Sequence, residues 1–144
     1  MDHEEKVRRT VDALFGDGAA SALPRGLEMS FSRSGRLRGV LHGGKLLCTV
    51  RPDGGLAITM AMARMLASRK KFRENCVVVD GEAAPFVREG RSVFARHVTW
   101  CGGNVRVGSE TPVLHRGRVI AVGRAALSAA MIRDFGRGVA VRVR

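Results

Sequence analysis

The sequence predicts an α+β fold in which a small N-terminal α+β domain is followed by a small, partly open β-barrel. Three observations support this prediction. Helical periodicity is confined to a few short segments, and short alternating or apolar runs of the strand type fill much of the remaining chain. The basic run at residues 68–73 has the character of a boundary. A length of 144 residues suffices for two small domains, which we expect at 1–73 and 74–144.

The first half begins with a helix over residues 4–15, in which Val7, Val11, Leu14 and Phe15 share one face. Gly16-Asp17-Gly18 ends that helix, and an irregular passage follows as far as Gly26. Alternation and turn residues then predict three strands and a closing helix that Thr59 can cap. The predicted strands are 27–33, 36–41 and 45–51, and the helix is 59–68.

The second half contains many short strands and two short helices, a pattern typical of a small barrel. Asp80 is placed to cap the first of these helices, which stops at Gly90, and Ser128 is placed to cap the second, which runs through Ile132. The predicted strands are 76–79, 92–99, 105–107, 111–114, 118–124 and 139–143.

The charge balance indicates a polyanionic partner. The chain has 25 Lys and Arg against 13 Asp and Glu, a net charge of +12. Residues 88–144 hold 11 basic and three acidic residues, so most of the excess lies in about 40% of the chain. Such a concentration favours a nucleic-acid-binding patch. The alternative is a generally basic proteome, since arginine outnumbers lysine 21 to 4, as a GC-rich genome would also produce.

Other classes of protein lack support in the sequence. Cys48, Cys76 and Cys101 are widely spaced and form no ligand pattern with the histidines, so we expect no metal site, no disulfide and no cofactor. No apolar run is long enough to cross a membrane, and the charged N-terminus lacks a secretory signal. We therefore expect a cytoplasmic protein without a membrane partner.

The second half resembles a PUA domain, a small RNA-binding pseudobarrel. The residues that carry this resemblance are VVVDGEAAPFVREGRSVFARHV (77–98), RVIAVGRAALSAAMI (118–132) and GRGVAVRVR (136–144), and it covers 75–144. FGDGAASAL (15–23) and FSRSGRLRGVLHGGKLLCTVRPDGGLAIT (31–59) are similar to the penultimate domain of archaeal tRNA-guanine transglycosylase. That enzyme installs the precursor base of archaeosine in the D arm of tRNA.

The resemblance stops short of the enzyme's catalytic barrel, whose aspartates and Cys/His zinc cluster have no counterpart here. All six aspartates of this chain lie at predicted caps or turns, where their side chains bond the backbone. The resemblance therefore implies a non-catalytic RNA-binding protein, the small or accessory subunit of a split transglycosylase or a free-standing relative. Its expected partners are tRNA and a separately encoded catalytic subunit.

The expected RNA contacts lie after the first helix of the second half. Gly90 permits a close backbone approach, Arg91 offers a planar fork to a phosphate, and Ser92 offers a hydroxyl. Arg96 and His97 follow on the predicted strand. The resemblance adds Arg137, Arg142 and Arg144 to this RNA face. The alternatives are that Gly90 only ends a helix and that each arginine is merely solvated.

The aromatic residues offer less to an RNA partner. The apolar spacing of the six phenylalanines predicts core positions, and Trp100 is expected at an apolar edge or stacked on a terminal base. Two other functions remain open. One is a free-standing PUA factor in ribosome biogenesis or translation initiation, and the other is an enzyme that uses Cys101 or His97, for which no activating base is found. The N-terminal domain could brace its neighbour, dock the catalytic subunit or touch RNA.

Overall fold

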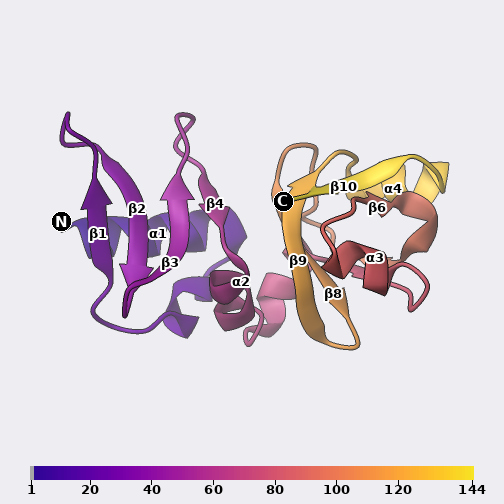
Figure 1. Ribbon diagram of the computed structural model, residues 1–144, viewed down its shortest axis with the longest axis horizontal. Coiled ribbons are helices and arrows are strands. Elements are labelled where there is room, and N and C mark those ends of the chain that lie inside the picture. Colours follow the sequence, from indigo (N-terminus) through magenta and orange to yellow (C-terminus); the bar gives the residue numbers. More distant parts are fainter. Residues whose placement is uncertain (1) are drawn as a thin grey trace. The chain divides into compact units, whose positions relative to one another are not determined.

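The computed structural model describes residues 2–144, which form two compact units. The first ends at Phe72 and the second begins at Arg73. Each unit combines one β-sheet with short helices, so the predicted α+β class is confirmed (Figure 1). None of the described helices is long and apolar enough to cross a membrane.

Helix α1 (His3–Phe15) supplies much of the core of the first unit. Asp2 caps it, because its Oδ1 accepts a hydrogen bond of 2.7 Å from the backbone N–H of Glu5. Val7, Val11 and Phe15 are buried as expected. The burial expected for Leu14 is wrong: this side chain lies at the margin of the apolar stripe and is 44% exposed.

An antiparallel sheet in the order β1-β2-β3-β4 completes this unit. Its strands are β1 (Glu28–Phe31), β2 (Leu37–His42), β3 (Lys45–Val50) and β4 (Leu56–Ile58). The sequence did not predict β4, because three residues directly after a Pro-Asp-Gly-Gly turn are too few to show alternation. Helix α1 crosses behind the sheet in Figure 1 and leaves its front face open.

Helix α2 (Met60–Leu66) follows the sheet, with Thr59 as its N-cap. The short 3₁₀ helices are η1 (Ala19–Ala22) and η2 (Lys70–Asn75). Most of the basic run at 68–73 therefore lies in a 3₁₀ helix, and its basic side chains are exposed. Phe72 within it is fully buried and packs edge-to-face on Phe15 at 5.5 Å between ring centroids.

The second unit holds a mixed sheet in the order β6-β10-β9-β8-β5-β7. The two edge strands, β6 and β7, are joined by a single 3₁₀ turn, η3 (Ala95–His97), so the sheet curls into a nearly closed pseudobarrel. Pairs of neighbouring strands are antiparallel except β5 with β8. The strands are β5 (Val77–Val79), β6 (Val93–Phe94), β7 (Val98–Cys101), β8 (Glu110–His115), β9 (Arg118–Ala125) and β10 (Val139–Val143).

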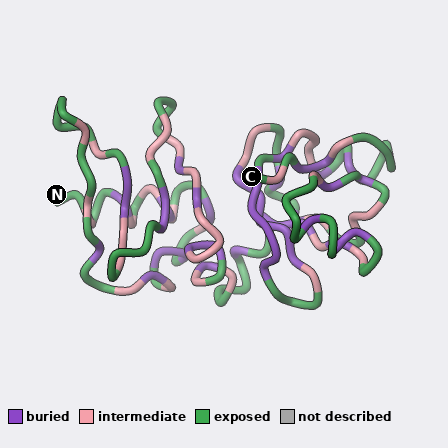
Figure 2. Tube along the Cα trace, viewed as in Figure 1, coloured by how far each residue is buried: buried purple, intermediate pink, exposed green. Residues whose placement is uncertain are grey.

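Helices α3 (Ala84–Arg88) and α4 (Ala129–Phe135) complete the pseudobarrel. Ser128 caps α4 as predicted, accepting a bond of 3.3 Å from the N–H of Met131. The core contains small and β-branched side chains, and Figure 2 shows β8 and β9 buried along most of their length. A strand covered on both sides loses its alternating pattern, which explains the continuous apolar run 119–122.

Two predictions for this unit and one for the whole chain are wrong. The strand expected over 92–99 is broken by η3, because the chain must turn there from one sheet edge to the other. Residues 105–107 form no strand, although Val105 is buried. Among the phenylalanines, only Phe15 and Phe72 are core residues. The others are exposed, namely Phe31, Phe86, Phe94 and Phe135.

Candidate nucleic-acid interface

Helix α3 ends in a Schellman motif that presents the first predicted RNA contacts. The N–H of Gly90 donates to the carbonyl of Val87 and the N–H of Arg91 donates to that of Phe86, both at 3.0 Å. Gly90 has φ +99°, and a Cβ there would meet no atom within 4 Å. Gly90 therefore ends helix α3 and also leaves the backbone at this turn open to a ligand. Arg91 is exposed and Ser92 half-buried at the exit of the turn.

Pairing of β6 with β10 brings distant arginines to this turn. Val141 is opposite Val93, and continuing the antiparallel register places Arg142 beside Ser92. At the other end of the pair, the N–H of Ala95 donates to the carbonyl of Gly138 at 2.8 Å. That bond sets η3 and its Arg96 against the α4–β10 loop that carries Arg137. The sheet thus joins residues 90–96 to residues 137–142, which are about 45 positions later.

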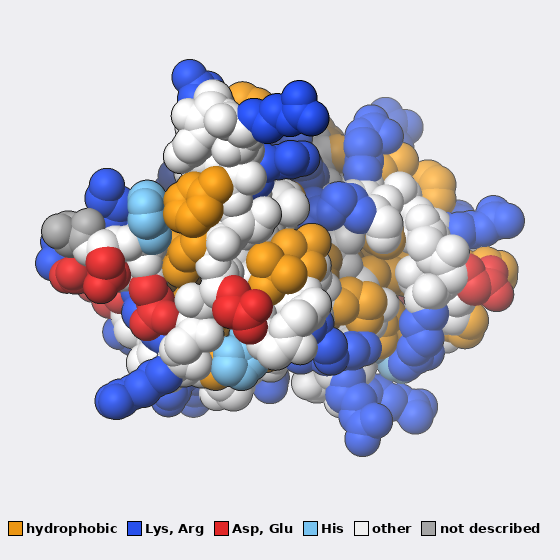
Figure 3. Space-filling model, turned by 60° about the vertical axis from the view of Figure 1, so that its left-hand side comes forward, with side chains coloured by type: hydrophobic (Ala, Val, Ile, Leu, Met, Phe, Trp, Pro, Cys, Tyr) orange, Lys and Arg blue, Asp and Glu red, His pale blue; other side chains and the backbone are white. Residues whose placement is uncertain are grey.

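We call the resulting surface the β6 face. It comprises Gly90, Arg91, Ser92, Phe94, Arg96, Arg137 and Arg142. Its four arginines are all exposed, and none of them pairs with a carboxylate within residues 2–144. Unpaired guanidinium forks retain their donors for a phosphate ligand. On the face of the molecule drawn in Figure 3, Lys and Arg side chains are more widespread than acidic ones.

Arg144 has a different role from the other predicted arginines. Its Nη2 and Nη1 donate to Oε2 and Oε1 of Glu110 at 2.7 and 2.9 Å, and the Glu110 side chain is only 3% exposed. A two-point ion pair to a buried carboxylate fastens the end of β10 to the start of β8. The guanidinium fork that would grip a phosphate therefore faces the protein instead.

His97 also contacts the protein rather than solvent. Its Nδ1 donates to Oδ2 of Asp80 at 2.9 Å, and the backbone N–H of Asp80 donates to the carbonyl of His97 at 3.0 Å. Oδ1 of Asp80 accepts from the N–H of Ala83 before α3. The bond from His97 holds the pKa of the Asp80 carboxyl below its usual range, although burial acts in the opposite direction. The pair ties the η3 turn to the start of the helix.

The same pair belongs to a cluster that sequence reasoning did not assemble. Ligand atoms of Asp80, Glu82 and His97 lie within 4.8 Å of one another. His97 is 17 residues from Asp80 in the sequence, so no short motif signals the group. The bond from His97 to Asp80 already gives two of its members a structural role.

Phe94 is the residue of the β6 face that sequence reasoning missed. It is 47% exposed, between buried Val93 and buried Ala95, and Arg96 follows on the outer side. The signal was present as a short alternation of buried and outward residues, but apolar spacing alone assigned Phe94 to the core. An exposed ring among arginines can stack on a base. Trp100 on β7 is similarly exposed, at 44%.

The cysteines give no support to a thiol enzyme. Burial raises the pKa of Cys48 and that of Cys76 to about 12. Burial also raises the pKa of Cys101, which outweighs the opposite influence of Arg133. Each thiol is therefore less ionised at neutral pH than a free cysteine, whereas a nucleophilic cysteine needs a lowered pKa.

Comparisons with known proteins identify both units. Residues 75–144 match the PUA domain, and residues 5–72 match the patch-forming domain C2 of tRNA-guanine transglycosylase. The chain is a PUA-domain protein. Its two domains resemble the C2 and PUA domains of archaeal tRNA-guanine transglycosylase, as the sequence resemblance had indicated.

Relatives and solved structures agree with this assignment. The tRNA-guanine(15) transglycosylase of Methanobrevibacter smithii is 33% identical over 99% of this chain, and that of Pyrococcus abyssi is 36% identical over 90%. This chain spans 22% of the length of each. A conserved PUA domain protein from Thermoplasma acidophilum shares the fold with a TM-score of 0.72 at 24% identity, covering 98% of this chain and 86% of that one. A hypothetical protein from Pyrococcus horikoshii gives 0.76 at 22%, covering 97% and 87%.

Proposed function

We propose that this protein is a non-catalytic tRNA-binding protein that presents tRNA to a separately encoded transglycosylase catalytic subunit. The observation that carries the proposal is the β6 face, where strand pairing brings four exposed arginines of two distant segments to the same sheet edge as an open glycine turn and an exposed aromatic ring. The relatives act on tRNA by name, and this chain aligns with only about a fifth of their length. These facts support a role in substrate binding.

The chemistry of the β6 face suits RNA better than a protein partner. Phosphates are recognised by arginine forks, backbone N–H groups and hydroxyls, and the face supplies the first and the last of these. Arg91 and Ser92 follow a glycine without a side chain, so a ribose-phosphate backbone can approach the main chain closely. Phe94 lies between Arg91 and Arg96 in the sequence and can stack an unpaired base, such as one at the single-stranded end of tRNA.

Binding to tRNA is tested by fluorescence anisotropy with the full chain and a labelled, unmodified tRNA transcript over a KCl series. The same transcript without its 3′ single-stranded end and a length-matched DNA duplex are the controls. We expect tight, salt-dependent binding to the intact transcript that weakens on trimming. Equal and weak binding to all three nucleic acids would mean that net charge alone attracts them, and the proposal would then be wrong.

The accessory role requires a second test. Incorporation of labelled base at position 15 of tRNA is measured with a transglycosylase catalytic subunit from the same genome, with and without this chain. We expect the chain to lower the tRNA concentration needed for half-maximal rate. No change in that concentration would contradict the accessory role and leave the free-standing PUA factor as the alternative.

A further inference from the structure

We propose that the open face of the sheet in the first unit is a second binding site for the sugar-phosphate backbone of RNA. The inference rests on the proposed function, because it assumes that the protein binds RNA through the β6 face. The site is a groove of about 1060 Å³ lined by the outer surface of β1–β3 and by the turns that follow β1 and β3. We call it the sheet groove.

The floor of the sheet groove follows from strand register. Ser30 pairs with Gly39, Gly39 with Thr49, and Thr49 with Ala57, so small residues form one row across all four strands. The neighbouring row, Met29, Val40, Cys48 and Ile58, faces the opposite side and is mostly buried. A row of small side chains on the open face leaves a trough that crosses the strands.

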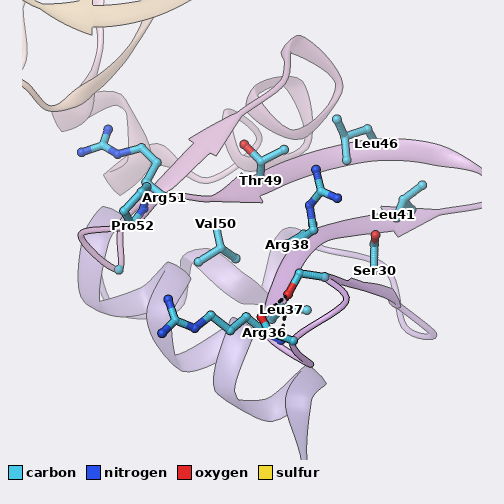
Figure 4. A pocket seen from close by; sticks show the side chains of 14 residues that line it. Ser30, Arg36, Leu37, Arg38, Leu41, Leu46, Thr49, Val50, Arg51 and Pro52 are labelled. Carbon is cyan, nitrogen blue, oxygen red and sulfur yellow. Dashed lines mark hydrogen bonds between the residues drawn. The ribbon is translucent and has the colours of Figure 1, made fainter.

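Larger side chains border this trough. Leu41 pairs with Leu46 on one side of it. On the other side, Arg36 comes from the turn before β2, Arg38 from the start of β2, and Arg51 from the position directly after β3. In Figure 4 the Arg38 side chain rises from β2 on the same side of the sheet as Thr49 and Leu46.

The lining chemistry points to an anionic polymer. The lining includes three arginines and four hydroxyl side chains, and none of the described lining residues is a carboxylate. Arg51 forms an ion pair with Asp53, in which Nη2 of Arg51 lies 2.6 Å from Oδ2 of Asp53. Arg36 and Arg38 are exposed and make no ion pair within the part of the chain that the structure describes. The two unpaired forks and the Ser30 and Thr49 hydroxyls line the same groove, and both kinds of donor bind phosphates.

The shape of the site favours RNA over a single small anion or an apolar protein segment. A trough that crosses three strands is longer than one phosphate needs, and an extended RNA backbone would bring successive phosphates to it. The core of a protein-docking surface is depleted in charged residues. Here three arginines line the groove beside the apolar side chains of Leu37, Leu41, Leu46 and Val50, so an apolar segment would leave their guanidinium groups without anionic partners.

The test compares three variants of the full chain in the tRNA anisotropy assay. Arg36→Ala/Arg38→Ala removes two charges from the sheet groove. Lys6→Ala/Arg64→Ala is the matched control, since it removes two charges from exposed helical positions outside the groove. Thr49→Phe fills the trough without changing charge and introduces a residue that strands accept. Thermal unfolding confirms that each variant is folded.

We expect the groove variant to lower the slope of log K against log [KCl] by about 1.5, equivalent to two lost phosphate contacts, and the control by less than half of that. Thr49→Phe should also lower the slope, because a blocked trough excludes phosphates that its arginines still attract. Unchanged slopes in both groove variants, with tight wild-type binding that β6-face variants weaken, would overturn this inference alone. Failure of the wild-type chain to bind tRNA would overturn the proposed function itself.

Discussion

The ion pair between Arg144 and Glu110 provides a quantitative test of how the pseudobarrel is held together. Replacing Arg144 by alanine removes two charge-assisted hydrogen bonds, of 2.7 and 2.9 Å, from a carboxylate whose side chain is 3% exposed. Loss of one partner of a fully buried pair costs about 3–5 kcal/mol. Because the Arg144 side chain is 40% exposed, solvent already screens part of this interaction. We therefore expect a loss of about 2–3 kcal/mol in the free energy of unfolding.

The assay uses the single tryptophan of the chain, Trp100, which lies on β7 of the second unit. Its fluorescence during urea unfolding therefore reports on the second unit. With a urea dependence of about 1–2 kcal/mol per M, the Arg144→Ala midpoint should fall by about 1–2 M. Arg142→Ala is the control, since Arg142 is exposed on the same strand, and it should change stability by less than about 0.5 kcal/mol.

The double-mutant cycle with Glu110→Gln separates the pair from other contacts of either residue. Because glutamine leaves no buried charge, the loss caused by Arg144→Ala should be smaller in that background by about 1–2 kcal/mol. Equal effects of Arg144→Ala and Arg142→Ala on the urea midpoint would refute the reasoning. Arg144 would then return to the set of solvent-facing arginines available to RNA.

Three further predictions concern packing, protonation and thiol chemistry. A Cβ at Gly123 would lie 2.2 Å from the carbonyl oxygen of Arg142, so Gly123→Ala should separate β9 from β10. We expect this variant to have a lower urea midpoint and weaker tRNA binding. A wild-type urea midpoint together with wild-type tRNA affinity would contradict the prediction. The bond from His97 lowers the pKa of Asp80, so the stability contributed by this carboxylate is present at neutral pH and is lost as the pH falls below about 3.9. Lowering the pH should therefore reduce the free energy of unfolding of the second unit more in the wild type than in the Asp80→Asn variant. Parallel curves of unfolding free energy against pH for the two proteins would contradict a stabilising bond between His97 and Asp80. Because burial raises the pKa of Cys101, its reaction with a disulfide reagent at pH 7.5 should be slower than that of free cysteine, and faster reaction would revive a thiol enzyme.

Local sequence signals predicted the elements whose causes are local. Helix α1 has its apolar stripe, and Thr59 and Ser128 accept the cap bonds expected of them. The turn at Gly43-Gly44 joins β2 and β3, as the two glycines indicated, and both have positive φ. In each of these cases the residues that determine the conformation are within about four positions of one another.

The misjudged elements depend on partners that are distant in the sequence. The strand expected over 92–99 is interrupted because β6 and β7 lie at opposite edges of one sheet, which no local pattern reveals. β4 forms because Ile58 pairs with Cys48 on β3. Exposure of Phe94 follows from its place on an edge strand, and hydrophobicity alone cannot distinguish such a position from the core.

The candidate site also combines features set by neighbouring residues with features set by distant ones. The glycine turn at Gly90 and the basic character of Arg91 and Arg96 are readable from the sequence. The different roles of Arg142 and Arg144 cannot be read from the sequence, because the buried carboxylate that binds Arg144 is 34 residues away on another strand. Charge counting treats these two arginines alike, whereas the fold leaves one to solvent and pairs the other.

The salt dependence of tRNA binding by a β6-face variant tests the central claim most directly. The double variant Arg91→Ala/Arg96→Ala is compared with Arg116→Ala/Arg118→Ala, which removes the same charge at the tip of the β8–β9 hairpin. If the β6 face binds the RNA backbone, the slope of log K against log [KCl] should fall by about 1.5 in the first variant and remain close to wild type in the second. Equal slopes for the two variants would contradict a localised RNA site on the β6 face.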